Sequence, residues 1–230
     1  MERVTALSTF TNAVLAGIAL GIAGTVNLSV GGGIPGAFLF GFGLFLILCY
    51  TFKLYTGAIG YLFEQKPGEF WCYVKTLIII WLGNFAGTAL VAFLIRQTRH
   101  AAKIVPMAEN MCVGKLADTP ISILILAIFC GFLMYVAVET FRRDLPSLFR
   151  FAMVFLCVMV FILSGFEHCI ANMYYFCLAG CFTTGHTHVV LAHGQEIAYA
   201  PLPTLGYLLL MTLGNSIGGW FLPIMSRFRG

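Results

Sequence analysis

Long stretches without any charged residue are the feature that most constrains this chain. No charge occurs from residue 4 to residue 52, and uncharged runs of twenty residues fill 76–95 and 119–138. A membrane-spanning helix needs about 20 mostly apolar residues. Only 10% of the residues are charged and 60% are hydrophobic, whereas soluble domains carry about 25% charged residues. The sequence therefore predicts an integral membrane protein surrounded by a lipid bilayer.

Two apolar stretches are too short to span a membrane and end at polar residues. Residues 37–52 and 151–166 are each sixteen residues long, and they are followed by Lys53 and by Glu167-His168 respectively. Sixteen helical residues rise about 24 Å, which is less than a hydrocarbon core of ~30 Å. Each segment is therefore predicted to be a half-helix, a polar interruption and a second half-helix.

These interruptions occupy matching positions in a chain of six predicted spans. The sequence GGGIPG at 31–36 ends the first span, which covers about residues 9–30, because a helix passes poorly through three glycines and a proline. The interrupted segments are then the second and the fifth spans. Interrupted segments at corresponding positions are the sequence signature of an inverted repeat with its binding site at the membrane midplane.

A second motif that is repeated in both halves supports this architecture. The third and sixth spans each contain a GN-x-x-G element, with Asn84 in one and Asn215 in the other. Small residues at this spacing allow close helix approach, and a membrane-buried asparagine needs a hydrogen-bond partner. The prediction is one all-α domain of six transmembrane helices over 1–230, a 3+3 inverted repeat with halves of about 1–100 and 117–230.

Lysine and arginine residues predict the orientation of the spans. With six spans, the side that holds both termini carries eight of these residues, the opposite side carries four, and Lys53 is intramembrane. Cytoplasmic loops are the richer ones in lysine and arginine, so both termini are expected in the cytoplasm and the protein in the cytoplasmic (inner) membrane. The net charge is +4 and the sequence has no run of basic residues, so no nucleic-acid partner is expected.

Glu167 and His168 are the main candidates for function. A charge at bilayer depth costs several kcal/mol, so such residues usually face a cavity or a partner. We expect Ser164-Gly165 to open the helix, Glu167 to accept hydrogen bonds from freed backbone amides, and His168 to face a pathway. Histidine suits a proton-linked role because its charge changes near physiological pH. The alternative is that both residues only satisfy the broken backbone.

The interruption in the first half leaves more alternatives open. Thr56 offers a hydroxyl, and Gly57 permits an unusual turn. Lys53 could extend to the membrane surface, pair with Glu167, or supply positive potential to an anion path.

A histidine-rich loop follows the fifth span. His186, His188 and His193 lie near Glu196, and three histidines within eight residues could bind zinc. Their spacing matches no strong metal signature, so an exposed polar loop is the favoured interpretation. No metal and no cofactor are predicted.

The polar motifs together resemble a known family. The string SGFEHCIANM at 164–173, LYTG at 54–57 and the two GN-x-x-G elements resemble the formate/nitrite transporter family, which includes hydrosulfide channels. The likeness runs from the first predicted helix to the last. It implies an aquaporin-like protomer, a homopentamer with one pore per protomer, and passage of small monovalent anions such as formate, nitrite and hydrosulfide.

The resemblance also implies roles for individual residues. His168 matches the central pore histidine, and Thr56 and Leu54 match the loop residues that face it. Glu167 and Asn172, in the same stretch as the histidine, are expected to be structural polar residues, as are the asparagines of the two GN-x-x-G elements.

Three apolar residues match constrictions of the pore in the same way. Phe40 and Leu44 fall on cytoplasmic constriction positions, and Phe161 falls on the periplasmic one. From their spacing alone, the two phenylalanines would be taken as packing residues; the resemblance makes them gates.

Two positions depart from the family pattern. Arg150 stands where a lysine is usual, and Lys53 stands where an acidic residue is common. Both are expected to act electrostatically by raising the local anion concentration at the pore mouth. The physiological anion stays open, because formate, nitrite and hydrosulfide have equal charge and similar size.

The predicted function is a passive or proton-linked channel for small monovalent anions of weak acids, with His168 as the residue that would provide the proton link. The alternative is a membrane-embedded, metal-dependent hydrolase that uses Glu167, His168 and the histidines of 186–193. An adjacent Glu-His pair lacks the H-E-x-x-H spacing of zinc proteases, and no G-x-S-x-G element accompanies it. We therefore do not predict an enzyme.

Overall fold

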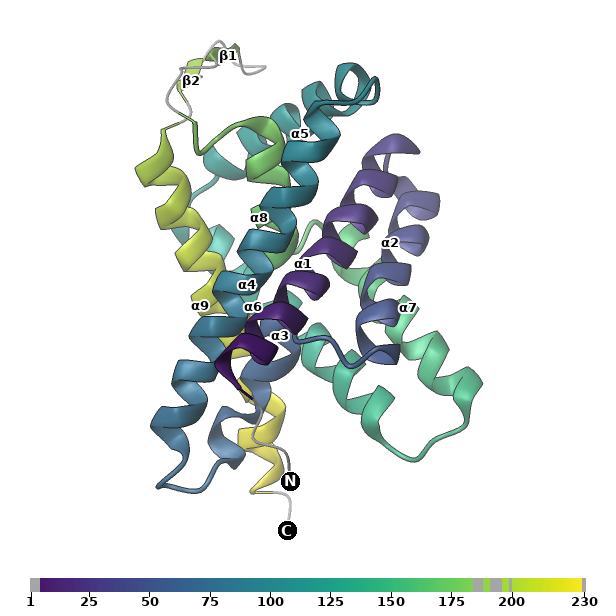
Figure 1. Cartoon of the computed structure of the whole chain (residues 1–230), viewed down its shortest axis with the longest axis vertical. Helices are drawn as coiled ribbons and strands as arrows, with labels where there is room; N and C mark the ends of the chain where they lie inside the picture. Colours follow the sequence, from purple (N-terminus) through teal and green to yellow (C-terminus); the bar gives the residue numbers. More distant parts are fainter. Residues whose placement is uncertain (1–4, 184–187, 191–195, 199, 229–230) are drawn as a thin grey trace.

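Four long apolar helices form the body of the protein (Figure 1). The computed structural model describes residues 5–183, 188–190, 196–198 and 200–228. The long helices have 23 to 27 residues, and at about 1.5 Å per residue each exceeds a hydrocarbon core of ~30 Å. As predicted, the chain is a helical membrane protein. The four helices are α1 (Ala6–Ser29), α4 (Phe70–Arg96), α6 (Pro120–Arg142) and α9 (Pro201–Ser226).

The long helices pack in two close pairs, α1 against α4 and α6 against α9. Each pair meets at a GN-x-x-G element. A Cβ on Gly87 would overlap the carbonyl oxygen of Val14 in α1, and a Cβ on Gly218 would overlap that of Ile128 in α6. Only glycine lets the two backbones come this close, as is typical of helix pairs in membranes.

The first interrupted segment breaks earlier than the sequence predicted. Helix α2 (Gly33–Cys49) is followed by a non-helical stretch at 50–54, a four-residue helix α3 (Tyr55–Ala58) and a 3-10 helix η1 (Ile59–Glu64). Gly57, predicted to permit the turn, lies inside α3 instead. The residue with positive φ is Thr51, at 55°.

The second interrupted segment follows the same plan, with a single α-helix as its second half. Helix α7 (Ser147–Leu163) is followed by a break at 164–168 and by α8 (Cys169–Ala179). The residue with positive φ here is Gly165, at 67°, in agreement with the prediction that Ser164-Gly165 opens the helix.

The turn between α1 and α2 is shorter than the GGGIPG sequence suggested. It occupies residues 30–32, and α2 includes Pro35 in its first turn. Proline is compatible with the first turn of a helix because its missing N–H would have no intrahelical partner there.

Helix α5 (Ala101–Leu116) was not predicted, because its residues were taken as a loop. Ile104, Ala108 and Cys112 are fully buried and recur every four residues, so they form one apolar face. This face lies against α8 and α1. At the start of the helix, Lys103 Nζ donates to the carbonyl oxygen of Ser29 at 2.6 Å.

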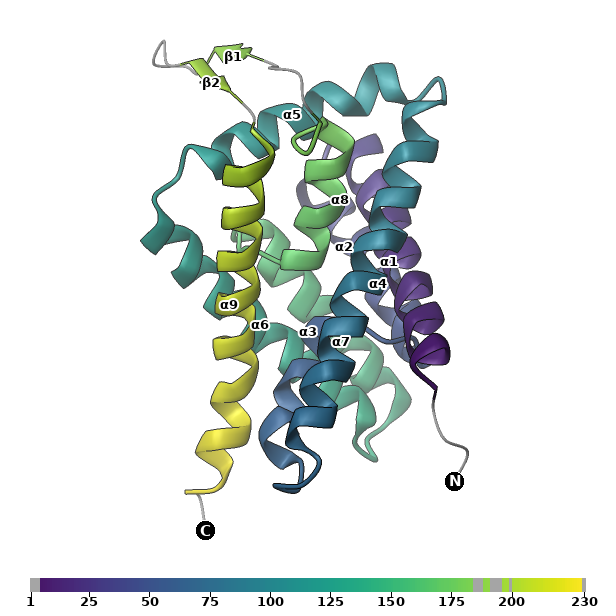
Figure 2. The same ribbon diagram turned by 60° about the vertical axis from the view of Figure 1, so that its left-hand side comes forward.

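The two ends of the molecule differ in their elements. Helix α5 lies at the end where α1 stops and α9 starts, together with an antiparallel hairpin of β1 (His188–Val190) and β2 (Glu196–Ala198) (Figures 1 and 2). The opposite end holds the start of α1, the end of α9, η1 and the connection between α6 and α7. This small hairpin is the exception to the predicted all-α fold.

Candidate functional site

A buried asparagine repairs the backbone at the first break. Asn84 in α4 is fully buried, and its Oδ1 accepts the backbone N–H of Tyr55 at 2.9 Å. Its Nδ2 donates to the carbonyl oxygens of Lys53 and Ala13, both at 2.8 Å. The side chain therefore supplies partners that the broken helix cannot, which a segment at membrane depth requires.

Asn215 in α9 makes the corresponding contacts at the second break. Its Oδ1 accepts the backbone N–H of Cys169 at 2.8 Å. Its Nδ2 donates to the carbonyl oxygens of Glu167 and Ala127, both at 2.7 Å. Each asparagine thus joins one long helix pair to the break beside it, and both breaks are held in fixed positions.

Glu167 is neutralised by a residue that sequence reasoning missed. Its Oε2 lies 2.6 Å from Lys115 Nζ in α5 and accepts a hydrogen bond from Asn172 Nδ2 at 2.7 Å. The hydrogen bonds found for this carboxylate therefore come from side chains, not from the freed backbone amides that we expected. The pairing with Lys53 that the sequence left open is also wrong for this structure.

His168 joins the second break to the first. Its Nε2 lies 2.9 Å from Thr56 Oγ1, while its Nδ1 accepts the backbone N–H of Ala171 at 3.1 Å. A backbone N–H only donates, so in the neutral ring the proton lies on Nε2 and points at the threonine hydroxyl. Both side chains are buried. The two breaks therefore meet at one polar contact inside the protein.

Phenylalanines flank this contact on one side. The Phe161 ring stacks on the His168 ring with centroids 5.6 Å apart, and the Phe40 ring meets Phe161 edge-on at 5.9 Å. A cavity of about 160 Å³, which we call the α5-side cavity, is lined by these three residues and by Lys115. The Lys115–Glu167 ion pair therefore lies beside the histidine.

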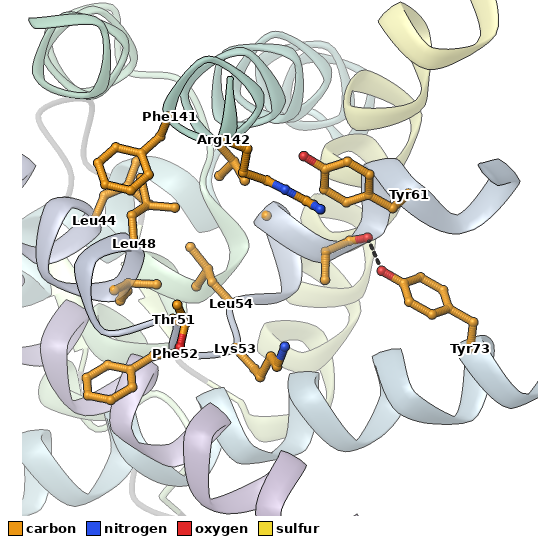
Figure 3. Close-up of a pocket in the computed structure, with 14 residues that line it drawn as sticks. Leu44, Leu48, Thr51, Phe52, Lys53, Leu54, Tyr61, Tyr73, Phe141 and Arg142 are labelled. Atoms are coloured by element: carbon orange, nitrogen blue, oxygen red, sulfur yellow. Dashed lines mark hydrogen bonds between the residues drawn. The ribbon is translucent and has the colours of Figure 1, made fainter. Parts of the chain in front are cut away.

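Leucines flank the contact on the other side. Leu44 and Leu54 line a second cavity of about 410 Å³, the η1-side cavity (Figure 3). No described residue lines both cavities. Phe40 thus faces the opposite cavity from Leu44, although the sequence grouped these two residues. The two leucines and the two phenylalanines are each at most 4% exposed. We call these four buried side chains, which line one cavity or the other, the apolar partition.

The positive charges at the η1-side cavity are Lys53 and Arg142. Arg142 was counted as a loop charge, but it lies in the last turn of α6. Arg150, predicted to act at the mouth, lines a different pocket with Ser147. Its guanidinium lies over the Phe141 ring, 5.8 Å from the centroid. Phe141 lines both this pocket and the η1-side cavity, so Arg150 lies behind Phe141 and does not line the η1-side cavity.

The histidine-rich loop lies largely outside the described residues. His186 and His193 lie outside the described residues, and no side chain is described for His188 or Glu196. Within the described part of the chain, no group of three or more His, Cys, Asp or Glu side chains is arranged to hold a metal ion.

Comparison with known proteins agrees with this architecture. A formate-nitrite transporter of Entamoeba histolytica is 26% identical over 231 residues, covering 93% of this chain and 61% of that protein. The nitrite transporter NirC of Escherichia coli is 26% identical over 190 residues, covering 78% of this chain and 65% of that protein. The chain thus spans less than two thirds of the length of these relatives.

A solved structure shares the fold. The structure of a pentameric formate channel with formate bound superposes with a TM-score of 0.76 at 23% identity, covering 97% of this chain and 96% of that chain. The family model for formate/nitrite transporters matches residues 2–228. The chain therefore belongs to the formate/nitrite transporter family.

Proposed function

We propose that this protein is a membrane channel for small monovalent anions of weak acids, namely formate, nitrite or hydrosulfide. One observation carries the proposal. His168 lines the α5-side cavity, Leu54 and Gly57 beside Thr56 line the η1-side cavity, and the buried hydrogen bond between His168 and Thr56 joins the two. A single polar contact in an apolar wall is the arrangement that a route for a small anion needs.

The partition explains why a proton would accompany the anion. A bare anion loses its hydration among leucine and phenylalanine side chains, which is costly. Formate, nitrite and hydrosulfide all have weak conjugate acids, and the neutral acid would cross this wall at a much lower cost. His168 donates from Nε2 to Thr56 Oγ1, so the same N–H is placed to meet an anion that replaces the hydroxyl.

The charges on the α5 side fit passage of an anion. Glu167 would repel an anion approaching His168, but Lys115 lies 2.6 Å from its carboxylate oxygen. The ion pair removes net negative charge from the α5-side cavity. Positive groups at the η1-side cavity would raise the local anion concentration at the other entrance.

The finer architecture is part of the proposal. We infer six spans in a 3+3 inverted repeat over residues 1–230, with α2–η1 and α7–α8 as the second and fifth spans. The matching contacts of Asn84 and Asn215 support this assignment. The solved relative is pentameric, and we propose that this chain also forms homopentamers. The lysine and arginine distribution supports a cytoplasmic-membrane protein with its η1 side in the cytoplasm.

Anion flux into liposomes tests the function. Purified protein in liposomes should carry formate, nitrite or hydrosulfide faster than protein-free liposomes. Leu44→Trp adds bulk at the partition, where Leu44 is 1% exposed, and should abolish this flux. Leu39→Trp, on the same helix at a position that is 40% exposed, is the matched control and should conduct normally. Folded wild-type protein that carries none of the three anions would refute the proposal.

The hydrolase alternative is not favoured by the contacts of Glu167. Its Oε2 is engaged by Lys115 and Asn172, whereas a catalytic base must reach its substrate or water. His186 and His193 fall outside the described residues. One zinc ion bound per protein chain in the purified protein, together with hydrolytic activity, would revive this alternative.

A further inference from the structure

The η1-side cavity contains two cations whose charges no carboxylate neutralises within the described residues. Lys53 and Arg142 both line it, and both are exposed. The ion pairs in the described part of the chain join Lys115 to Glu167 and Arg143 to Glu139. Two like charges on one cavity repel each other, and an anion between them would relieve that repulsion.

The carboxylate of Glu139, one turn before Arg142 on α6, is already engaged by other residues. Tyr61 Oη donates to Glu139 Oε2 at 2.9 Å, and Arg143 Nε donates to Glu139 Oε1 at 3.1 Å. Arg142 instead lies over the Tyr61 ring, with its guanidinium carbon 4.3 Å from the centroid. The ring holds the guanidinium in place without neutralising its charge.

The cavity has a polar side and an apolar side (Figure 3). Arg142 and Lys53 lie toward the side of Tyr61 and Tyr73. Residues of α2 and the end of α6 form the opposite side, with Leu44, Leu48 and Phe141. A ligand with an anionic head and a hydrocarbon tail would match both sides, as is usual for pockets that combine apolar walls with a few polar groups.

The size of the cavity also favours a ligand larger than the transported anion. Its volume is about 410 Å³, whereas a water molecule occupies about 30 Å³ in the liquid. A three-atom anion would occupy a small part of this space and leave the rest to water. An organic acid of four or five carbons would fill much more of it.

We infer that the η1-side cavity is a binding site for organic carboxylates with a short apolar tail. The carboxylate lies between Lys53 and Arg142, and the tail packs against Leu44 and its apolar neighbours. Such a ligand is too bulky for the partition and therefore blocks entry from the η1 side. The binding site stands by itself, whereas the block rests on the proposed anion-channel function.

Binding is tested first, in a form that needs no transport. Butyrate should raise the unfolding temperature of the detergent-solubilised protein, because a ligand that binds only the folded state stabilises it. Lys53→Gln and Arg142→Gln should each weaken the apparent affinity about tenfold, the usual effect of losing a hydrogen bond to a charged group. Lys66→Gln removes an exposed lysine from outside the cavity and should leave the affinity unchanged.

Block is tested with alkanesulfonates, which keep their charge and do not cross the bilayer as neutral acids. Butane-1-sulfonate added outside liposomes should inhibit anion flux through channels whose η1 side faces outward. Methanesulfonate should inhibit more weakly, by up to about fourfold for each missing methylene. Inhibition by butane-1-sulfonate should weaken in Lys53→Gln and Arg142→Gln but not in Lys66→Gln.

The outcomes separate this inference from the proposed function. Stabilisation by butyrate that is equal in wild type, Lys53→Gln and Arg142→Gln, or absent in all of them, would overturn the binding site. Normal anion flux that butane-1-sulfonate does not inhibit would overturn the block alone. Wild-type protein without any anion flux would refute the channel, while cation-dependent butyrate stabilisation would still support the site.

Discussion

The two helix breaks have the same backbone geometry but treat their charges in opposite ways. In each, a residue with positive φ follows the helix end, and the next residue donates its backbone N–H five residues back, Phe52 to Ile47 and Phe166 to Phe161, both at 2.9 Å. The break at 164–168 buries its charge and pairs it. The break at 50–54 leaves its charge exposed beside a large cavity.

This difference indicates how a membrane protein can carry charge at depth. Glu167 is 4% exposed and depends on Lys115, because a buried charge without a partner costs several kcal/mol. Lys53 makes no ion pair among the described residues and lies in a cavity where water or an anion solvates it. The second break should therefore be sensitive to substitution, whereas the first should tolerate changes that alter transport.

Removing the buried partner should have the largest effect. Lys115→Met leaves Glu167 as an unpaired buried carboxylate, and we expect a loss of about 3–5 kcal/mol in the free energy of unfolding. Denaturant unfolding in detergent measures it. The double variant Lys115→Met/Glu167→Gln should recover most of the loss, since neither charge remains. If the double variant were as unstable as Lys115→Met, the loss of stability would not come from the unpaired Glu167 carboxylate.

Removing either asparagine tests whether the two breaks share one repair. Asn84→Leu and Asn215→Leu each leave three backbone groups without a side-chain partner, so each should lose about 2–4 kcal/mol of unfolding free energy. Asn12→Leu is the control, because its side chain bonds only Ser8 in its own helix. A large loss at one asparagine and none at the other would contradict the shared repair.

The residues with positive φ should respond with opposite signs. Thr51 has φ 55°, which is strained for a β-branched residue, so Thr51→Gly should be neutral or stabilising by up to about 1 kcal/mol. Gly165→Thr should destabilise by about 1–2 kcal/mol. A Cβ at Gly165 meets nothing within 4 Å, so only the backbone strain is measured. Destabilisation by Thr51→Gly, or no destabilisation by Gly165→Thr, would contradict backbone strain at these positions.

The exposed lysine should have the smallest effect on stability. Lys53→Met should change the free energy of unfolding by no more than about 0.5 kcal/mol. Anion flux at low ionic strength should fall, because the positive charge that attracts the anion is gone. The dependence of flux on salt should flatten, because salt has less charge left to screen. Flux of wild type and variant in liposomes at two salt concentrations provides the comparison; identical salt dependence would show that Lys53 does not face the entrance.

The sequence predicted the breaks because their signal is local. A run of sixteen apolar residues is too short to span the membrane, and the polar residue that ends it marks the interruption. The asparagines were identifiable for a similar reason, since few other polar residues lie at that depth. His168 and Thr56 were placed by resemblance, and the structure brings their side chains within 2.9 Å.

The missed features depend on tertiary contacts. Lys115 lies 52 residues from Glu167 in sequence, and nothing local marks it as a partner. Helix α5 was taken as a loop because Lys103 and Lys115 were counted among the charges between spans, and its 16 residues are too few to cross a membrane. Arg142 and Arg150 are both basic residues near the same loop, and only the fold decides which one faces the η1-side cavity.

The pH dependence of flux in His168→Asn tests the central claim most directly. Asparagine keeps a hydrogen-bonding side chain beside Thr56 but cannot take up and release a proton as an imidazole does. After subtraction of protein-free liposomes, wild-type formate flux should change across that range, and the variant should lose most of this change. Superimposable pH profiles in the two proteins would contradict a proton-linked route through His168.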